Sequence, residues 1–422
     1  MNPPRKIAVV GLGYVGLPLA VALARHYAVV GYDLNARRIE ALNGGHDATG
    51  EVTDEELASC GARFSAYAEA MRDSDLFIIT VPTPVDEERR PDLSAVRAAC
   101  AAIGGVMARG ATVVLESTVY PGVTEGVCAP DLAQASGLAY GADFNIGFSP
   151  ERMNPGDKEH SLARLTKVVS GDTPETAAML RDVYGTVTNG NVFVARDIRT
   201  AEAAKVIENA QRDINIAFIN EVSMIFSKLG LSSYDVLDAA RTKWNFLPFT
   251  PGLVGGHCIG VDPYYLAHKA QEIGHDPEVI LAGRRINDAM GGYIAETVMA
   301  RLDGPARILV LGLTFKENVP DLRNTRVVDI VQTLALAGHA VDVHDACADP
   351  EEAERLYGLT LAGELDTLSG YDAVIGAVPH RAYAALGAAE LERLLKPGGL
   401  LADIKGMWRA VTLGEGFRRW SL

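Results

Sequence analysis

A glycine-rich segment near the start of the chain constrains its fold more than any other feature. Gly11, Gly13 and Gly16 form the pattern G-x-G-x-x-G, with a short apolar run before it and a helical run after it. In a strand–turn–helix unit, the first glycine makes a tight turn and the second lets the backbone approach a pyrophosphate. The third lets the helix pack closely against the strand. The segment therefore predicts a doubly wound α/β domain that binds a dinucleotide at the helix N-terminus.

The next apolar run, residues 28–32, ends in Asp33. A carboxylate here accepts hydrogen bonds from a ribose 2′-hydroxyl and repels a 2′-phosphate, which favours NAD over NADP. Two alternatives remain open: FAD as the ligand, or a turn without ligand in which Asp33 caps the helix that starts near Asn35. Thr83 and Thr118 follow later strand-like runs, where ligands of open α/β sheets bind. We expect them at the cofactor edge unless they only cap turns.

Strand-like and helical runs alternate in both halves of the chain, which is typical of βαβ units around a parallel sheet. The string SDLFIITVP near residue 78 is echoed by YDAVIGAVP near residue 375. Between the halves, residues 200–229 contain no proline or glycine and place apolar residues at helical spacing. The expected fold class is α/β, with two Rossmann-like doubly wound domains joined by a long central helix.

Three segments are expected along the chain. Residues 1–197 form an N-terminal NAD-binding Rossmann domain, residues 198–300 a central helical segment with a cysteine loop, and residues 301–422 a C-terminal Rossmann-like domain. A helix as long as the central one serves as a spine between domains or packs against a second subunit, and both remain hypotheses.

Composition excludes several classes of protein. Asp plus Glu outnumber Lys plus Arg by 54 to 39, and the net charge of −15 repels phosphate backbones, so no nucleic-acid partner is expected. The 5 cysteines form no C-x-x-C pair and the 9 histidines no H-x-x-x-H pair, so neither a disulfide framework nor a metal site is expected. The uncharged residues 7–24 are interrupted by glycines and Pro18, which argues against a signal peptide or membrane span. We expect a cytoplasmic protein without membrane contact.

One cysteine stands out by its surroundings. Residues 251–263 read PGLVGGHCIGVDP, so glycines surround Cys258. Glycine-rich backbone can approach a ligand and supply amide donors. Asp262 and Pro263 have the pattern of a helix start, and a cysteine just before a helix N-terminus is favoured as the thiolate. Cys258 is therefore a candidate nucleophile. The alternative, a small buried apolar residue, is our interpretation of the other cysteines.

A polar stripe runs along the predicted central helix. Lys205, Asn209 and Arg212 are spaced i, i+4 and i+7, so they share one side of the helix beside its apolar face. Such a stripe suits a cleft. A solvated face carrying pairs such as Asn209–Asp213 is the other explanation, and the spacing alone favours it.

A nicotinamide cofactor together with a cysteine nucleophile indicates a particular chemistry. Hydride removal from an alcohol gives an aldehyde, and a thiolate can capture it as a thiohemiacetal. A second hydride removal gives a thioester, which water converts to a carboxylate. A nearby lysine can stabilise the oxyanion.

Seven strings distributed over most of the chain resemble the UDP-glucose/GDP-mannose dehydrogenase family, and most of all its UDP-N-acetylhexosamine 6-dehydrogenase branch. They are GLGYVGLPLA, VPTP, ESTVYPGVTE, SPERMNPGD, AAKVIENAQRDINIA, GLVGGHCIGVDPYYL and LGLTFKENVPDLRNTR. The resemblance implies two Rossmann-like domains and a connecting helix that builds a homodimer or higher homo-oligomer. It also implies that residues 198–300 form the dimerisation domain and that residues 301–422 bind the UDP-sugar.

The resemblance assigns catalytic roles to five residues. Cys258 matches the nucleophile, Lys205 the general acid/base and oxyanion partner, and Asn209 stands beside it. Glu151, in the string SPE, matches the residue that positions or activates the hydrolytic water. Asp262 matches the carboxylate that supports Lys205 and the water.

The resemblance also assigns ligand contacts, and it implies no metal. The residues that match cofactor positions are Gly11, Gly13, Tyr14, Val15, Gly16, Asp33, Arg38, Thr83, Thr118 and Arg323. The residues that match substrate positions are Arg152, Met153, Lys205, Asn209, Arg212, Gly255, Phe315, Lys316 and Lys405. Without the resemblance, Lys316, Arg323 and Lys405 would be interpreted as surface charges.

Two departures from the family pattern bear on the substrate. Members that act on UDP-glucose carry lysine where this chain has Val261, and an aromatic residue where it has Arg152. Both favour an acetamido sugar. The expected activity is NAD-dependent four-electron oxidation of UDP-N-acetylglucosamine, or its epimer UDP-N-acetylgalactosamine, at C6 to the uronate, a precursor of capsule or O-antigen polysaccharide. The alternatives are a UDP-N-acetylmannosamine dehydrogenase, a UDP-glucose 6-dehydrogenase, and a catalytically silent protein that binds NAD and nucleotide sugars.

Overall fold

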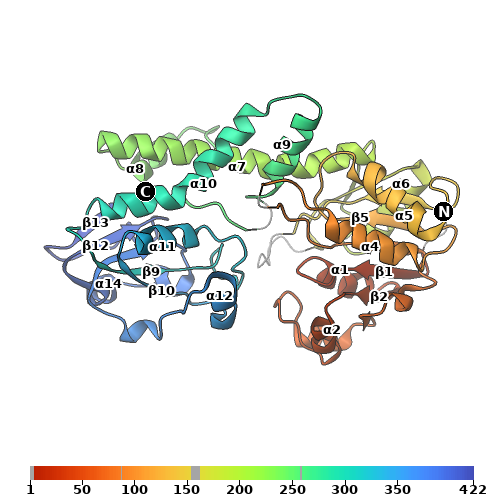
Figure 1. The fold of residues 1–422 in the computed structure, drawn as a ribbon, viewed down its shortest axis with the longest axis horizontal. Coiled ribbons are helices and arrows are strands. Elements are labelled where there is room, and N and C mark those ends of the chain that lie inside the picture. Colours follow the sequence, from red (N-terminus) through yellow and green to blue (C-terminus); the bar gives the residue numbers. More distant parts are fainter. Residues whose placement is uncertain (1–3, 87, 154–161, 257–258) are drawn as a thin grey trace. The chain divides into compact units, whose positions relative to one another are not determined.

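The computed structural model describes residues 4–86, 88–153, 162–256 and 259–422. The chain divides into two compact units. The first unit comprises Met1–Glu208 and Tyr264–His275, and the second comprises Asn209–Pro263 and Asp276–Leu422. The long helix α7 (Ile198–Leu229) is continuous through the division and contributes to both units (Figure 1). The predicted three-segment division is finer than these units and stays a prediction.

The first unit is built on a sheet with the strand order β3-β2-β1-β4-β5-β6-β7-β8. The order reverses between β1 and β4, which is the switch point where doubly wound sheets bind nucleotides. Neighbouring strands are parallel except β6 and β7, which pair antiparallel. The strands are β1 (Lys6–Val10), β2 (Ala28–Tyr32), β3 (Arg63–Ser65), β4 (Leu76–Ile79), β5 (Thr112–Leu115), β6 (Asn145–Phe148), β7 (Lys167–Gly171) and β8 (Val192–Val194).

Helices cover both faces of this sheet, so its central strands are apolar on both sides. In β1, Ile7 and Val9 pack into the core that includes α1, whereas Ala8 and Val10 pack into the core that includes α4. The helical elements are α1 (Gly16–Leu23), α2 (Ala36–Asn43), α3 (Asp54–Ser59), η1 (Ala68–Met71), α4 (Ser94–Gly104), η2 (Thr124–Cys128), α5 (Ala129–Ser136), α6 (Pro174–Gly185) and α9 (Asp262–Glu272).

The second unit is built on a smaller parallel sheet with the order β10-β9-β11-β12-β13. Its strands are β9 (Arg307–Leu311), β10 (Ala340–His344), β11 (Tyr371–Gly376), β12 (Leu395–Asp403) and β13 (Arg418–Ser421). The helical elements of this unit are α8 (Ser233–Ala240), α10 (Glu278–Met299), α11 (Val327–Leu336), α12 (Pro350–Tyr357), η3 (Leu365–Thr367), α13 (Arg381–Ala384) and α14 (Ala388–Leu394).

The predicted fold class is confirmed, with two doubly wound sheets and a long central helix. The uncharged residues 7–24 form most of β1, the glycine turn and α1. Among the described residues, every helix is too short or too polar to span a bilayer.

Candidate active site

The glycine turn between β1 and α1 has the geometry that its pattern predicts. Gly11 adopts φ +95°, and a Cβ there would lie 3.1 Å from the backbone of Thr80. A Cβ on Gly16 would lie 1.8 Å from the carbonyl oxygen of Gly11, so only glycine fits. A Cβ on Gly13 would meet nothing within 4 Å, which leaves room for a ligand against the backbone. Val15 provides no side-chain cap for α1, so its first-turn N–H groups suit a pyrophosphate.

Thr80 holds this turn, and sequence reasoning missed it. Its hydroxyl donates to the carbonyl oxygens of Val10 at 3.1 Å and Gly11 at 2.7 Å. A threonine at the end of an apolar run is a weak signal, because a turn or cap explains it equally well. The Thr80 hydroxyl therefore fixes the positions of these two carbonyl oxygens.

Asp33 lies at the carboxyl end of β2, beside the glycine turn. Its two carboxylate oxygens accept hydrogen bonds from the backbone N–H of Leu12 and of Asn35, both at 2.8 Å. Asn35, not Asp33, caps α2, so the alternative in which Asp33 caps that helix is wrong. Each carboxylate oxygen has a second lone pair, so Asp33 can still accept from a ribose hydroxyl. The residues present therefore fit NAD.

Arg38, which matches a cofactor position, is held in place by Leu12 of the glycine turn and by Asp47. Its Nε donates to the carbonyl oxygen of Leu12 at 3.0 Å, and its guanidinium lies 2.7 Å from the buried carboxylate of Asp47. Burial alone would raise the pKa of Asp47, but hydrogen bonds from Thr49, Val52 and Arg38 outweigh burial and lower it. Asp47 therefore stays ionised and anchors the guanidinium.

The strand order brings the other predicted cofactor residues of the first unit to the same edge. Thr83 follows β4 and Thr118 follows β5, and β4 lies between β1 and β5 in the sheet. The Ser117 hydroxyl donates to the carbonyl oxygen of Val81 at 2.6 Å, which ties the two loops together. Tyr14 is half-buried in the turn itself. Arg323 belongs to the second unit, where Asp321 binds its guanidinium at 2.8 Å and 3.0 Å. Its contact with the cofactor stays a prediction.

Glu151 lies directly beyond the carboxyl end of β6, at this edge of the first sheet. One of its oxygens accepts from the backbone N–H of Arg152 at 2.7 Å and from that of Met153. The other lies 3.5 Å from the ammonium of Lys167. Lys167 in turn lies 2.6 Å from a carboxylate oxygen of Glu116. Sequence reasoning missed Lys167 and Glu116, because each stands at the end of an apolar run, where a charged residue is an ordinary feature.

Arg152 is fixed by two contacts on its guanidinium. It donates to the carbonyl oxygen of Thr166 at 2.9 Å and lies 2.6 Å from the carboxylate of Glu208 on α7. The guanidinium is only partly exposed, at 32%. The guanidinium is therefore held in place by these contacts, and its contact with substrate stays a prediction.

The polar stripe on α7 is largely buried, which corrects the solvated-face alternative. Lys205 and Asn209 are 6% and 3% exposed, whereas Arg212 is exposed. The Asn209 side chain donates to the carboxylate of Asp262 at the start of α9, instead of pairing with Asp213. Two predicted catalytic residues are thus in contact, and a third lies one helical turn away on the same helix.

Cys258 itself lies outside the described residues. The loop that leads to it is held by contacts with Asn220 and Lys405. Gly252 adopts φ +150°, and a Cβ there would lie 2.9 Å from the ammonium of Lys405. Its N–H and carbonyl group both bond the side chain of Asn220, at 2.8 Å and 3.0 Å. The Lys405 ammonium donates to the carbonyl oxygen of Pro251 at 3.3 Å, and burial lowers the pKa of Lys405.

The next glycines of this loop lie against a predicted substrate residue. A Cβ on Gly255 would lie 2.7 Å from the carbonyl oxygen of Asn324 and 3.4 Å from Phe315. A Cβ on Gly256 would lie 2.7 Å from the Phe315 ring. Lys316, also predicted to bind substrate, is half-buried next in sequence. In the second unit, Phe315 and Lys405 therefore both lie against the loop that carries Gly255.

The other cysteines divide into two groups. Cys100 and Cys128 are buried in the core of the first unit, as predicted. Cys60 and Cys347 are half-buried, so the interpretation as fully buried residues is wrong for these two.

Asp345 occupies in the second sheet the position that Asp33 occupies in the first. It follows β10 and accepts hydrogen bonds from the backbone N–H of Leu313 at 2.5 Å and of Thr314 at 2.9 Å, in the turn after β9. Burial alone would raise the pKa of Asp345, but His380 and these N–H groups outweigh burial and hold it well below its usual range.

His380 closes this edge of the second sheet. Its Nε2 lies 3.0 Å from the Asp345 carboxylate, and its Nδ1 accepts from the N–H of Asn318 at 2.9 Å. Together with Cys347, these residues place three potential metal-binding atoms within 4.8 Å of one another. Because both ring nitrogens already have hydrogen-bond partners, the set fits a structural network better than a metal site.

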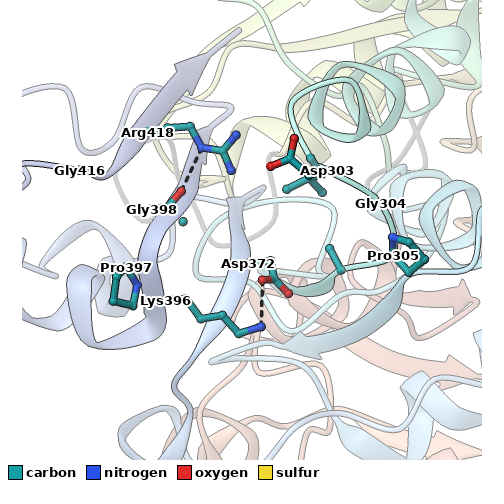
Figure 2. A pocket seen from close by; sticks show the side chains of 12 residues that line it. Asp303, Gly304, Pro305, Asp372, Lys396, Pro397, Gly398, Gly416 and Arg418 are labelled. Atoms are coloured by element: carbon teal, nitrogen blue, oxygen red, sulfur yellow. Dashed lines mark hydrogen bonds and ion pairs between the residues drawn. The ribbon is translucent and has the colours of Figure 1, made fainter.

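An open hollow of about 600 Å³ lies at the opposite edge of the second sheet, where its strands begin (Figure 2). Three of the charged residues that line it, Asp372, Lys396 and Arg418, have partners within the protein. Lys396 pairs with Asp372 at 2.9 Å, and Arg418 donates to the carbonyl oxygen of Gly398 at 2.9 Å (Figure 2). Ligands of open α/β sheets bind at the carboxyl ends of strands, so the candidate site remains at that edge.

Three consecutive parts of the chain match models of the UDP-glucose/GDP-mannose dehydrogenase family. Residues 5–188 match its NAD binding domain, residues 199–289 its central domain and residues 309–410 its UDP binding domain.

Individual proteins are similar over nearly the whole chain. Protein CapL from Staphylococcus aureus is 50% identical, over 99% of this chain and 100% of its own. A UDP-N-acetyl-D-glucosamine 6-dehydrogenase from Pseudomonas aeruginosa is 51% identical, over 95% of this chain and 96% of its own. Among solved structures, a UDP-D-ManNAc dehydrogenase from Pyrococcus horikoshii matches with a TM-score of 0.88 at 31% identity, covering 98% of both chains.

Proposed function

Because the chain belongs to the UDP-glucose/GDP-mannose dehydrogenase family, we propose that it oxidises C6 of UDP-N-acetylglucosamine to the carboxylate, with NAD as cofactor. The observation that carries the choice of sugar is the 51% identity to the Pseudomonas aeruginosa protein named for this reaction. Arg152 and Val261, where members acting on UDP-glucose carry other residues, support an acetamido sugar.

When bound, NAD would supply the oxidising power as a hydride acceptor, and the overall oxidation needs two hydride acceptances. Gly11, Gly13, Gly16 and Asp33 would hold it at the carboxyl edge of the first sheet, with Tyr14, Val15, Arg38, Thr83 and Thr118 around it. Arg323, in the second unit, is the remaining residue that matches a cofactor position.

Residues of this chain form the covalent bond to C6 and transfer the protons. The thiolate of Cys258 adds to the C6 aldehyde, which forms a C–S bond and gives a thiohemiacetal. Lys205 takes the proton of the C6 hydroxyl and then stabilises the oxyanion. After the second oxidation the carbon is a thioester. Glu151 orients water toward it, and Asn209 and Asp262 position Lys205 and the water. Hydrolysis breaks the C–S bond and returns the thiolate.

Residues that match substrate positions occur in each unit. Arg152, with Met153 beside it, is already fixed by Thr166 and Glu208, and Arg212 is exposed on α7. The second unit would contribute Gly255, Phe315, Lys316 and Lys405. Lysines and arginines suit the diphosphate, and an aromatic ring suits the nucleobase or sugar face.

The experiment that tests the proposal is NADH formation over a panel of sugars. UDP-N-acetylglucosamine should give the highest kcat/KM, ahead of its galacto and manno epimers and UDP-glucose. A preference for UDP-N-acetylmannosamine would favour the activity for which the Pyrococcus horikoshii protein is named. Binding of NAD and UDP-sugar without NADH would indicate a silent binding protein.

A homodimer is the assembly we propose. Phe218, Ile225 and Leu229 are 58%, 49% and 64% exposed and lie along one side of α7. Exposed apolar side chains along one stripe mark an interaction surface. Light scattering should give twice the chain mass, and Phe218→Asp should shift the measured mass toward that of the monomer.

A cytoplasmic location agrees with the requirement for a reduced Cys258.

A further inference from the structure

Three buried side chains lie behind Glu151 and have no role in the proposed function so far. They are Glu116, Lys167 and Tyr184, named here the buried charged cluster. Their exposed fractions are 0%, 2% and 0%. Glu151 connects this cluster to the site, since its own side chain is 12% exposed.

The sheet topology brings these residues to the catalytic edge. Glu116 directly follows β5, and Glu151 lies just beyond β6, so both lie at the carboxyl edge. Lys167 is the first residue of β7, yet it reaches the same edge because β7 pairs antiparallel with β6. Tyr184 comes from α6, which packs against this part of the sheet.

The contacts form a chain that ends on Glu151. The Tyr184 hydroxyl donates to one oxygen of Glu116, and the other oxygen lies 2.6 Å from the Lys167 ammonium. Burial raises the pKa of Tyr184, so the phenol stays protonated and donates. The same ammonium lies 3.5 Å from Glu151 and 5.3 Å from the Tyr184 ring centroid.

Each oxygen of the Glu151 carboxylate is therefore directed by a different contact. One oxygen accepts from the backbone N–H groups of Arg152 and Met153. The other faces Lys167. Burying an unpaired ammonium is unfavourable, so the two carboxylates of Glu116 and Glu151 stabilise Lys167 in its buried position. Burial would lower the pKa of Lys167, but Glu116 and Glu151 outweigh burial and raise it, so Lys167 stays charged.

We infer that Lys167 is a positioning residue for thioester hydrolysis, which it serves by fixing the orientation of the Glu151 carboxylate. The inference rests on the proposed role of Glu151. In that step the water oxygen bonds to C6, its proton passes to Glu151, and the C–S bond breaks with the electron pair leaving on Cys258. Glu116 and Tyr184 hold the ammonium in place.

The test separates hydrolysis from the oxidation steps. We compare wild type with Lys167→Met, Lys167→Arg and Glu151→Gln in rapid mixing with UDP-N-acetylglucosamine and excess NAD. Lys167→Met should keep the initial burst of NADH but lower steady-state turnover by about 10². Intact-protein mass should then show the sugar attached as a thioester, as it should for Glu151→Gln. Lys167→Arg, which keeps the charge, should recover part of the rate.

A double variant tests whether the effect of Lys167→Met is caused only by unfolding of the protein. Glu116→Gln combined with Lys167→Met removes both buried charges and keeps an acceptor for Tyr184, so it should fold and still accumulate thioester. Lys396→Met, the same change at a half-exposed lysine, should behave as wild type. The inference is overturned if Glu151→Gln accumulates thioester and the Lys167 variants do not. If no variant accumulates it and wild type forms no NADH, the proposed function fails instead.

Discussion

The side chain of Asn209 donates a hydrogen bond to the carboxylate of Asp262, which joins the middle of α7 to the first turn of α9. The two residues are 53 positions apart, and both are buried. They match two of the catalytic positions that the motif strings imply. Their contact shows that these strings meet around one part of α7.

Asn209→Ala should lower both stability and turnover. The change removes a donor to a buried carboxylate, which costs about 1–3 kcal/mol. We expect a lower melting temperature and a lower kcat at unchanged KM for NAD. Asn215→Ala is the matched control, because Asn215 lies on the same helix and its side chain donates to the carbonyl oxygen of Gln211, one turn earlier. Equal behaviour of the two variants would contradict the assignment.

The glycine turn allows folding and cofactor binding to be separated. Gly13→Ala should keep the melting temperature, since the added Cβ meets nothing within 4 Å, but it should abolish tight NAD binding. Gly16→Ala should destabilise the fold, since its Cβ would lie 1.8 Å from the Gly11 carbonyl oxygen. Thermal melts with and without NAD measure both effects. Tight NAD binding by Gly13→Ala would show that the pyrophosphate lies elsewhere.

Asp33→Ala should weaken the binding of NAD more than the binding of the UDP-sugar. The carboxylate organises Leu12 and Asn35 and is the expected acceptor for the ribose hydroxyl. We expect KM for NAD to rise at least about tenfold, the effect of one lost charged hydrogen bond. KM for the sugar should change little. Asp182→Ala, at an exposed carboxylate on α6, is the control. A larger change in sugar KM than in NAD KM would refute the role.

Acid stability should depend on Asp345. The pKa of Asp345 is lower in the folded protein than in the unfolded chain. Its ionised carboxylate therefore adds to the free energy of unfolding above the unfolded-chain pKa of about 3.9, and this stabilisation is lost as pH falls through the folded pKa. The wild-type melting temperature should therefore fall steeply below about pH 4. Asp345→Asn should be less stable at pH 7 and show a shallower acid dependence. Asp366→Asn, at a fully exposed carboxylate, should reproduce the wild-type curve.

Local sequence patterns were enough to predict the glycine turn, the long helix, the family and the cofactor. The glycine turn depends on residues adjacent in sequence, and α7 depends on a spacing that runs unbroken over residues 200–229. The family and its NAD cofactor, predicted from motif strings, are confirmed by the family models.

Other features depend on contacts that no local pattern carries. Helix α10 lies inside the predicted helical segment 198–300, although Gly291 and Gly292 disfavour a helix at their positions. The structure explains Gly291, since a Cβ there would lie 2.6 Å from Asp329 of α11. Lys167 reaches Glu151 only because β7 runs antiparallel to β6. The site roles taken from the resemblance, including that of Cys258, remain predictions.

The central claim is that one sulfur atom carries C6 through two oxidations, and the yield of NADH per uronate tests it most directly. The product should be quantified in parallel with NADH for wild type and for Cys258→Ser. We expect two NADH for each uronate in wild type, and turnover lower by orders of magnitude in the variant. One NADH per product, or near-normal turnover by Cys258→Ser, would contradict it.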